Sequence, residues 1–211
     1  MLLIGQFDSP FVRRVAITLG HYGMPFEQRP WSVWAHSEEL ARYNPLRRVP
    51  VLVLANDEVL VESAAILDYL DELAGEPSAL LPRTGAVRRD GLRVCAFATG
   101  LADKAVSLLY EHVLRGERSE PRWVKRCEDQ IRDVVELLEQ DRARRTTRCW
   151  LGDRFSHADI SVACALRFLS EAHPQLFEQA RYPYLAAHAA ECEALPVFLQ
   201  YQQTLSVTLS R

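Results

Sequence analysis

The chain has 211 residues, of which 48% are hydrophobic and 25% are charged, with a formal net charge of −3. This is the composition of an ordinary globular protein, long enough to bury a sizeable core without disulfides or structural metals. So small a charge gives no electrostatic reason to expect a nucleic acid or an anionic membrane as a partner. We expect one local basic stretch to be a solvated face: Arg142, Arg144, Arg145 and Arg148.

The first third of the chain alternates short strands with helices. Helices are predicted to begin at Ser9-Pro10, near Ser37 and at Glu62-Ser63. Serine is a favoured N-cap, and proline fits the first helical turn. The order βαβ, loop, ββα predicts an α/β domain, which we place at 1–75. Its strands are expected at 2–6, 26–29, 51–54 and 58–60.

Breaks rich in Gly and Pro predict a linker at 76–85. Every later segment has a helical pattern, so 86–211 is predicted to be an all-helical domain. Ser156 and Asp159 give the clearest helix start, because they fit a capping box. We expect that box to stabilise the fold and to take no part in catalysis. The predicted helices are at about 86–115, 122–143, 156–172, 183–193 and 196–203.

The five cysteines are scattered along the chain, with no CxxC motif and no metal-ligand spacing with histidine. We therefore expect no bound metal. Free thiols are typical of a reducing compartment, so a cytoplasmic location is predicted. The apolar start Met1-Leu2-Leu3-Ile4 is too short for a signal peptide, and no segment is apolar enough to span a bilayer.

Four short motifs resemble those of the glutathione S-transferase superfamily, and together they extend over nearly the whole chain. They are Ser9-Pro10-Phe11-Val12-Arg13, Asn44-Pro45 with Val49-Pro50-Val51, Glu62-Ser63, and Phe155-Ser156-His157-Ala158-Asp159. The general run of residues is most similar to bacterial members of the serine type. The resemblance implies a thioredoxin-like domain with a mixed sheet, an all-α domain after it, glutathione as co-substrate, and a homodimer.

Ser9 lies where the resemblance places the catalytic donor to the glutathione sulfur. The thiolate is the nucleophile, whereas a free thiol has a pKa of about 8.5. A hydroxyl and a helix N-terminus facing the sulfur favour its charged form. A plain N-cap for the helix at Pro10 is the alternative explanation. The turn from Gly5 to Val12 contains neither the tyrosine nor the cysteine that other branches use, which argues against the redox branch.

Val49-Pro50 and Glu62-Ser63 are expected to bind the glutathione peptide. The resemblance implies a cis bond before Pro50, with the Val49 backbone pairing with the cysteinyl residue as a strand would. An ordinary trans proline at a strand start is the alternative. The helix start and the Ser63 hydroxyl suit the α-carboxylate of the γ-glutamyl end, and Glu62 suits its ammonium group. Ser63 can be the helix N-cap at the same time.

Three residues are candidates for the glycyl carboxylate: Arg47, Arg48 and His36. Arginine pairs well with carboxylates, although loop arginines are usually solvated. Arg13 and Arg14 are expected either near the glutathione site or simply on a helix surface.

The electrophile site is expected between the two domains, where ligand sites often lie. Phe7 and Phe11 are candidates to line it from the first domain. Helical spacing cannot separate pocket from core for the candidates on the first long helix, which are Ala102, Asp103, Leu108 and Tyr110.

The leading hypothesis is therefore a glutathione transferase that adds the ionised thiol to a small hydrophobic electrophile, as in detoxification. A glutathione-dependent isomerase of the maleylacetoacetate type is an alternative, although that branch usually has a longer turn containing serine and cysteine. A binding protein that keeps the fold without turnover is a third possibility. Activity with an aromatic halide, or with a cis-dienone diacid, distinguishes the three.

Overall fold

The structure, a computed structural model, describes residues 1–206 and divides into two compact units. The first unit consists of Met1–Leu80 together with 195–206, and the second unit is Leu81–Ala194. The division after Leu80 falls inside the predicted linker. The grouping differs from the predicted domains at the other end, because 195–206 belong to the first unit rather than to the helical one. The remainder of the predicted helical domain, 207–211, lies outside the described residues.

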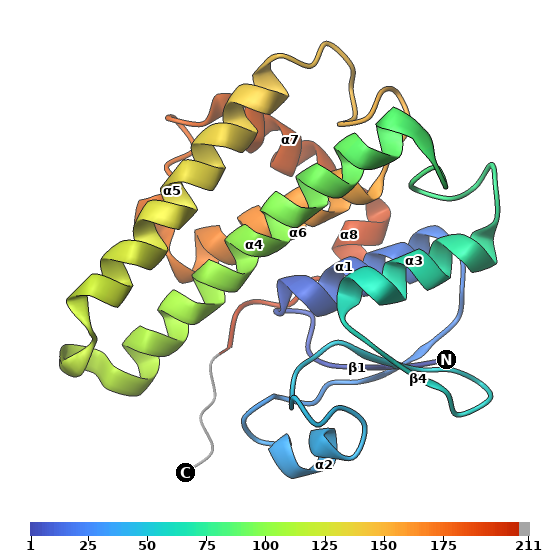
Figure 1. Cartoon of the computed structure of the whole chain (residues 1–211), viewed down its shortest axis with the longest axis horizontal. Helices are drawn as coiled ribbons and strands as arrows, with labels where there is room; N and C mark the ends of the chain where they lie inside the picture. Colours follow the sequence, from blue (N-terminus) through green and yellow to red (C-terminus); the bar gives the residue numbers. More distant parts are fainter. Residues whose placement is uncertain (207–211) are drawn as a thin grey trace. The chain divides into compact units, whose positions relative to one another are not determined.

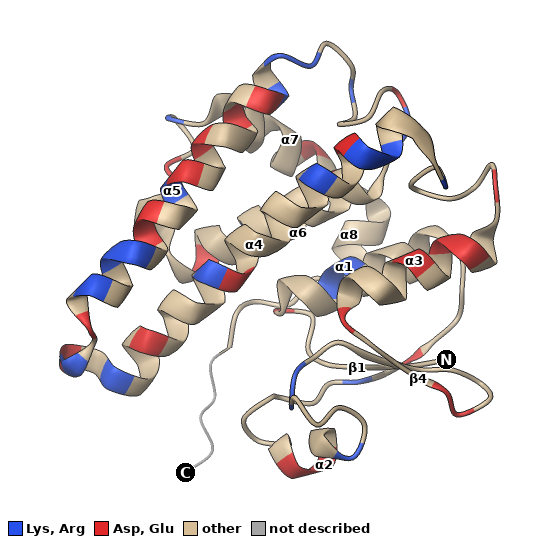
Figure 2. Ribbon diagram, viewed as in Figure 1, with Lys and Arg blue, Asp and Glu red and all other residues tan. Residues whose placement is uncertain are grey.

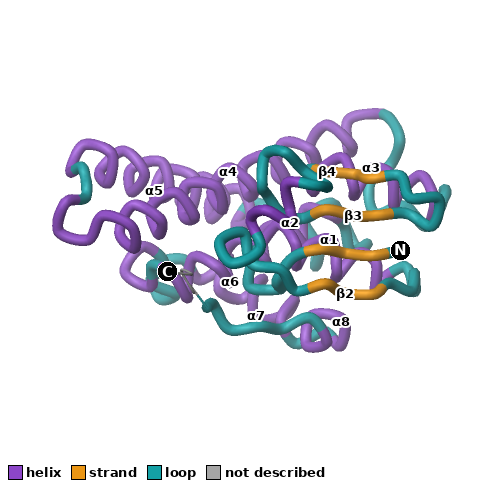
Figure 3. The backbone as a smooth tube through the Cα atoms, turned by 90° about the horizontal axis from the view of Figure 1, so that it is seen from below, coloured by secondary structure: helices purple, strands orange, loops and turns teal. Residues whose placement is uncertain are grey.

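The first unit contains a four-stranded mixed sheet in the order β2-β1-β3-β4, whose strands lie side by side in Figure 3. β1 runs parallel to β2 and antiparallel to β3, and β3 runs antiparallel to β4. Parallel strands need a crossover, which a helix provides here, whereas a tight turn joins β3 to β4. The strands are β1 (Leu2–Ile4), β2 (Glu27–Arg29), β3 (Val51–Val53) and β4 (Val59–Val61).

Helices lie on both faces of this sheet, with α1 and α3 on one face and the short α2 on the other (Figure 1). Alternate strand residues point to opposite faces. Ile4 and Val51 are cross-strand partners and pack with Leu40 of α2 in one buried cluster. The predicted thioredoxin-like fold is thus confirmed. The helices are α1 (Pro10–His21), α2 (Ser37–Ala41) and α3 (Ser63–Ala74).

The first unit also contains α8 (Pro196–Gln200), which packs against α1. The predicted helix at 196–203 is wrong at its end. Tyr201 leaves the helical conformation, with φ −113° and ψ 44°. The carbonyl oxygens of Phe198 and Tyr201 accept hydrogen bonds from the side chain of Arg13 instead of continuing the helix.

The second unit is helical, as predicted, and the starts and ends of its long helices agree with the prediction to within one residue. Most residues of α6 are buried, whereas α5 carries charged residues along its length (Figure 2). No helix in the described part of the chain is long and apolar enough to cross a membrane. The helical elements are α4 (Gly85–Arg115), α5 (Pro121–Ala143), α6 (His157–Ala172), α7 (Pro183–Glu193) and the short 3-10 helices η1 (Gly116–Arg118) and η2 (Pro174–Leu176).

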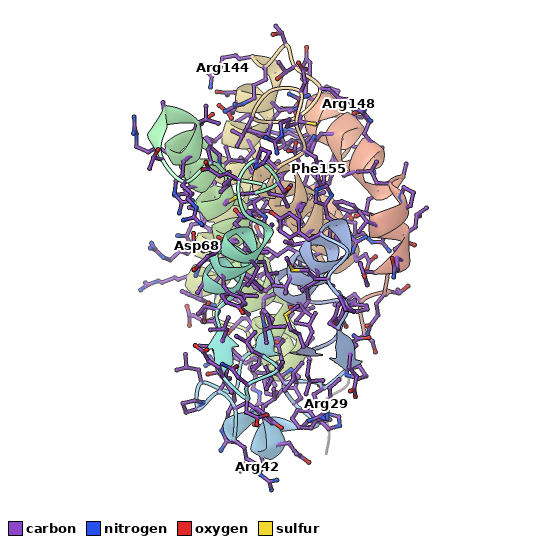
Figure 4. All side chains as sticks on the ribbon, turned by 90° about the vertical axis from the view of Figure 1, so that its right-hand side faces the viewer. Arg29, Arg42, Asp68, Arg144, Arg148 and Phe155 are labelled. Atoms are coloured by element: carbon purple, nitrogen blue, oxygen red, sulfur yellow. The ribbon has the colours of Figure 1, made fainter. Side chains whose placement is uncertain are left out.

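The basic stretch after α5 is only partly the solvated face that the sequence suggests. Arg144 extends outward from its loop (Figure 4) and is exposed. Arg145, in contrast, donates to a carboxylate oxygen of Asp141 at 2.8 Å and to the carbonyl oxygen of Trp150 at 2.6 Å. Burial raises the pKa of Asp141, but hydrogen bonds from Arg145 and from the Trp150 indole more than offset this, so that the pKa lies below its ordinary value. The prediction is wrong for Arg145 because a buried carboxylate holds it.

The predicted capping box at the start of α6 is confirmed. Asp159 Oδ2 accepts from the Ser156 N–H at 2.9 Å and from its hydroxyl at 2.6 Å. Its other carboxylate oxygen, Oδ1, accepts from the Trp150 N–H at 2.7 Å. Asp159 is 1% exposed, so these bonds replace the water that a buried carboxylate loses.

Candidate functional site

The sheet brings the three predicted glutathione-binding motifs of the first unit to one edge. β1 and β4 each pair antiparallel with β3, so both end at the edge where β3 begins. Ser9 follows β1, Val49 precedes β3, and Ser63 follows β4. Strand pairing thus gathers residues that are far apart in the sequence.

Ser9 is the N-cap of α1, but its hydroxyl is only weakly used. Its Oγ accepts from the Val12 N–H at 3.4 Å, beyond the usual range for such a bond. Among the described residues, no group accepts a hydrogen bond from the Ser9 hydroxyl. Capping uses a lone pair of the oxygen, whereas a thiolate would accept a hydrogen bond from the O–H. The N-cap and donor interpretations are therefore compatible.

Gly5 is a site-forming residue that the sequence did not single out. It has φ +135°, and a Cβ there would lie 2.5 Å from Cγ2 of Val12 and 3.0 Å from Cβ of Val49. Only glycine fits such a backbone at such an approach. Gly5 thus allows the end of β1 to pack directly against both α1 and the segment before β3. Its only sequence signal is a lone glycine between a strand and a turn.

The loop that leads to Val49 is held by a buried asparagine. Asn44 is 2% exposed; its Nδ2 donates to the Arg48 carbonyl at 2.9 Å, and its Oδ1 accepts from the Leu46 N–H at 3.0 Å. The Val49–Pro50 peptide bond is cis, as the resemblance implies. The sheet ladder of β3 begins at Val51, so the Val49 backbone lies beyond it.

The start of α3 is left open by the protein. Glu62 is the N-cap residue, yet its side chain makes no capping bond within the described chain, and its φ is +64°. Ser63 is the first helical residue and is 3% exposed. No group among the described residues hydrogen-bonds its hydroxyl. The suggestion that Ser63 is the N-cap is wrong, because the helix begins at Ser63 itself, one residue earlier than a serine cap requires.

The three candidates for the glycyl carboxylate lie in different surroundings. Arg47 is held by Glu38, at 2.6 Å, on the exposed side of α2. Arg48 lies 3.8 Å from the Glu62 carboxylate, at the start of α3. His36 stacks on Trp31, with ring centroids 5.8 Å apart. Its Nδ1 accepts a backbone N–H, so a neutral ring carries its proton on Nε2.

The candidates for the electrophile site lie in different surroundings. Phe11 is half-buried in the first turn of α1. Phe7 packs edge-on against Tyr201, with centroids 5.3 Å apart, so part of its surface belongs to the interior of the first unit. On α4, Ala102 and Leu108 are 2% and 0% exposed, which favours a role in the core of the second unit.

Arg13 and Arg14 do not lie on a helix surface, since both are 3% exposed. The Arg13 Nε donates to the Tyr201 carbonyl at 2.9 Å, and its Nη2 donates to the Phe198 carbonyl at 3.2 Å. A segment almost two hundred positions later in the chain buries this arginine, and nothing in the local sequence signals that contact.

A thioredoxin-like unit with these motifs at one edge, together with an all-helical unit, is the fold of a glutathione S-transferase. Residues 3–78 match the family model of the glutathione S-transferase N-terminal domain, and residues 121–191 match that of the C-terminal domain.

Individual proteins agree with the family models. A glutathione transferase family member from Pseudomonas fluorescens Pf-5, solved with bound glutathione, is 32% identical, with a TM-score of 0.86 over 97% of this chain and 99% of that one. A Methylobacterium radiotolerans glutathione S-transferase, solved with glutathione sulfonate, is 28% identical, with a TM-score of 0.92 over 100% and 98%. A probable maleylacetoacetate isomerase of Vibrio cholerae is 27% identical over 95% of this chain and 94% of its own length. The chain belongs to the glutathione S-transferase family and is an enzyme of that family.

Proposed function

We propose that this protein ionises glutathione beside Ser9 and adds the thiolate to a small hydrophobic electrophile. The observation that carries the proposal is the open start of α3. Its first N–H groups have no partner within the helix, and the hydroxyl of Ser63, a residue that is 3% exposed, has none among the described residues. Such a helix start suits a carboxylate. A non-glycine residue at positive φ, as at Glu62, is also typical of ligand-binding positions.

Each part of glutathione then has a partner at this edge of the sheet. The γ-glutamyl carboxylate binds Ser63 and the start of α3, and the ammonium group binds Glu62. The backbone of Val49 pairs with the cysteinyl residue, beyond the ladder of β3. Pro50, which is buried, fixes the end of that segment.

The glycyl carboxylate is assigned to His36, with a proton on Nε2 as donor. Arg47 is already paired with Glu38, so it is a poorer candidate. Arg48 lies beside Glu62, and we place it at the γ-glutamyl end instead. Phe11 is proposed to contact the electrophile, because it lies two residues beyond Ser9 on α1.

The chemical step requires a thiolate near neutral pH. A free thiol has a pKa of about 8.5, and one hydrogen bond to a charged group contributes about 1.5–3 kcal/mol. That corresponds to about one to two pKa units. The thiol proton leaves to water, the Ser9 hydroxyl donates to the sulfur, and the sulfur forms a bond to the electrophilic carbon. A leaving group then departs, or the adduct takes a proton from solvent.

The test is the ultraviolet absorbance of bound glutathione thiolate, followed across pH in the wild type and in Ser9→Ala. We expect Ser9→Ala to raise the bound thiol pKa by about one to two units and to lower turnover of an aromatic halide about 10- to 100-fold. Ser63→Ala is the crossed control, since it should weaken binding without moving this pKa. An unchanged pKa in Ser9→Ala contradicts the donor role, and binding without any turnover in the wild type points to a binding protein.

An isomerase of the maleylacetoacetate type is the second candidate. The match to a probable maleylacetoacetate isomerase over 95% of the chain favours it. The same thiolate would add to a cis-dienone diacid and leave again after bond rotation. Turnover of such a diacid at a rate well above that of the aromatic halide would make isomerisation the main activity.

The setting of this activity is proposed to be a homodimer in the cytoplasm, where conjugation removes reactive electrophiles. All five cysteines are free, which is typical of a reducing compartment. Size-exclusion chromatography with light scattering tests the dimer.

A further inference from the structure

The segment 201–206 returns to the turn that carries Ser9. It follows α8 in the first unit and passes beside the start of α1 (Figure 1). The Gln203 Oε1 accepts from the Phe7 N–H at 2.9 Å. The Ser206 N–H donates to a carboxylate oxygen of Asp8 at 3.1 Å. The two residues just before Ser9 are therefore both bonded to this segment.

The start of the segment is firmly anchored. Arg13 binds the carbonyl oxygens of Phe198 and Tyr201, and its guanidinium lies over the Phe198 ring, 5.5 Å from the centroid. Tyr201 is 8% exposed, and a Cβ on Gly20 would lie 2.6 Å from its ring. Gln203 thus extends from a part of the chain that is packed closely against α1.

The start of the turn is held by β2. The Gly5 N–H donates to the Arg29 carbonyl at 2.9 Å, and the Gln28 Nε2 donates to the Gly5 carbonyl at 3.0 Å. The bond from Phe7 to Gln203 supports the turn two residues further along the chain. Ser9 donates its N–H to the Gln6 carbonyl at 3.2 Å, and its carbonyl accepts from the Arg13 N–H at 2.9 Å. Among the described residues its hydroxyl has only the long capping bond to Val12. The Ser9 hydroxyl is thus weakly held by local bonds, and the bond from Phe7 to Gln203 is one of the contacts that support the turn that carries it.

We infer that Gln203 is a positioning residue for the reaction, which holds the Phe7 backbone so that Ser9 faces the glutathione sulfur. This inference rests on the proposed donor role of Ser9. Gln203 acts through the turn and does not touch the substrate in this assignment. An amide oxygen suits the position because the Phe7 N–H needs an acceptor, and a neutral one adds no negative charge near a thiolate.

The test compares Gln203→Met with Gln202→Met. Methionine is similar in length to glutamine but lacks the acceptor. Gln202 is the matched control, because it is adjacent and exposed and its side chain makes no hydrogen bond with the described residues. We expect Gln203→Met to lower turnover about 3- to 10-fold, the equivalent of one neutral hydrogen bond, and to raise the bound thiol pKa. Glutathione affinity should stay within about twofold of wild type, and Gln202→Met should leave all three quantities unchanged.

Two further measurements separate positioning from mere stabilisation. In a Ser9→Ala background, Gln203→Met should cause no further loss, because the residue that it positions is gone. Equal losses in both backgrounds, or unchanged turnover in Gln203→Met, would overturn the inference. Hydrogen exchange of the Phe7 amide should accelerate in Gln203→Met alone, and unchanged exchange would also overturn it. Since exchange does not depend on glutathione chemistry, a wild type without an ionised thiol would refute the proposed function separately.

Discussion

The starts of α3 and α6 each contain a serine and an acidic residue, but the protein treats them differently. At α6, Asp159 accepts hydrogen bonds from Ser156 and Trp150 and is 1% exposed. At α3, the Glu62 side chain is 54% exposed and makes no capping bond within the described chain. Ser63 is 3% exposed there, and its hydroxyl has no partner among the described residues.

The comparison separates a helix start that serves stability from one that is available to a ligand. The first N–H groups of any helix need partners from outside the helix. At α6 the protein supplies an acceptor from its own side chains. At α3 it supplies none, and Glu62 has φ +64°, a conformation that costs free energy for a residue other than glycine. A bound carboxylate would accept hydrogen bonds from these N–H groups at the start of α3.

The largest expected effect is on the stability of the second unit. Asp159→Ala removes an acceptor of three hydrogen bonds and leaves the Trp150 and Ser156 N–H groups unpaired. We expect the free energy of unfolding to fall by about 3–5 kcal/mol, more than the loss of about 1 kcal/mol for an ordinary N-cap. Asp129→Ala is the control, because among the described residues Asp129 forms only an exposed pair with Lys125. It should change stability by less than about 0.5 kcal/mol. Urea unfolding measures both.

Asp159→Ala also tests whether the start of α6 takes part in glutathione binding. Folded Asp159→Ala should bind glutathione with wild-type affinity in calorimetry. Normal stability combined with lost affinity would mean that the start of α6, and not that of α3, belongs to the site.

The next effect is on ligand affinity. Ser63→Ala removes a hydroxyl donor to a carboxylate, which should weaken glutathione binding by about 1.5–3 kcal/mol. The fold should be unaffected, because the hydroxyl has no partner in the described structure that would lose a bond. Ser78→Ala makes the same chemical change at an exposed position and should alter neither quantity. Unchanged calorimetric affinity in a folded Ser63→Ala protein would remove Ser63 from the site.

The contrast between the two helix starts also shows what the sequence could predict. The capping box at Ser156 and Asp159 follows from a local spacing, and it was predicted correctly. At α3 the sequence indicated the helix start but not which residue would be the cap, because a shift of one position reverses that assignment. Only the backbone conformation of Glu62 distinguishes a serine that caps the helix from one that is left unpartnered.

Contacts between distant segments account for the other differences. The sequence places Arg13 on a helix surface or near glutathione. In the structure, the carbonyl oxygens of Phe198 and Tyr201, which lie 185 and 188 positions later in the chain, accept its hydrogen bonds. The bond between Gln203 and Phe7 joins residues 196 positions apart, so no local pattern indicates it. The Arg145 contact with Asp141 spans only four residues, but it depends on the burial of that carboxylate, which charge patterns do not reveal.

The smallest expected effect tests the backbone at the start of α3. Glu62→Gly relieves a strained φ, so the free energy of unfolding should rise by about 1 kcal/mol. Glutathione binding should weaken about fivefold, because the proposed partner of the ammonium group is lost. Asp57→Gly is the matched control: Asp57 has φ +65° in the β3–β4 turn, outside the proposed site.

Asp57→Gly should gain less stability, since aspartate tolerates positive φ better than glutamate, and its glutathione affinity should equal that of wild type. Stability by urea unfolding and affinity by calorimetry give both comparisons on the same samples. A gain in stability without any loss of affinity in Glu62→Gly would make its conformation an ordinary turn. A loss of affinity accompanied by that gain would instead show that the protein gives up stability at α3 to keep a carboxylate beside the ligand.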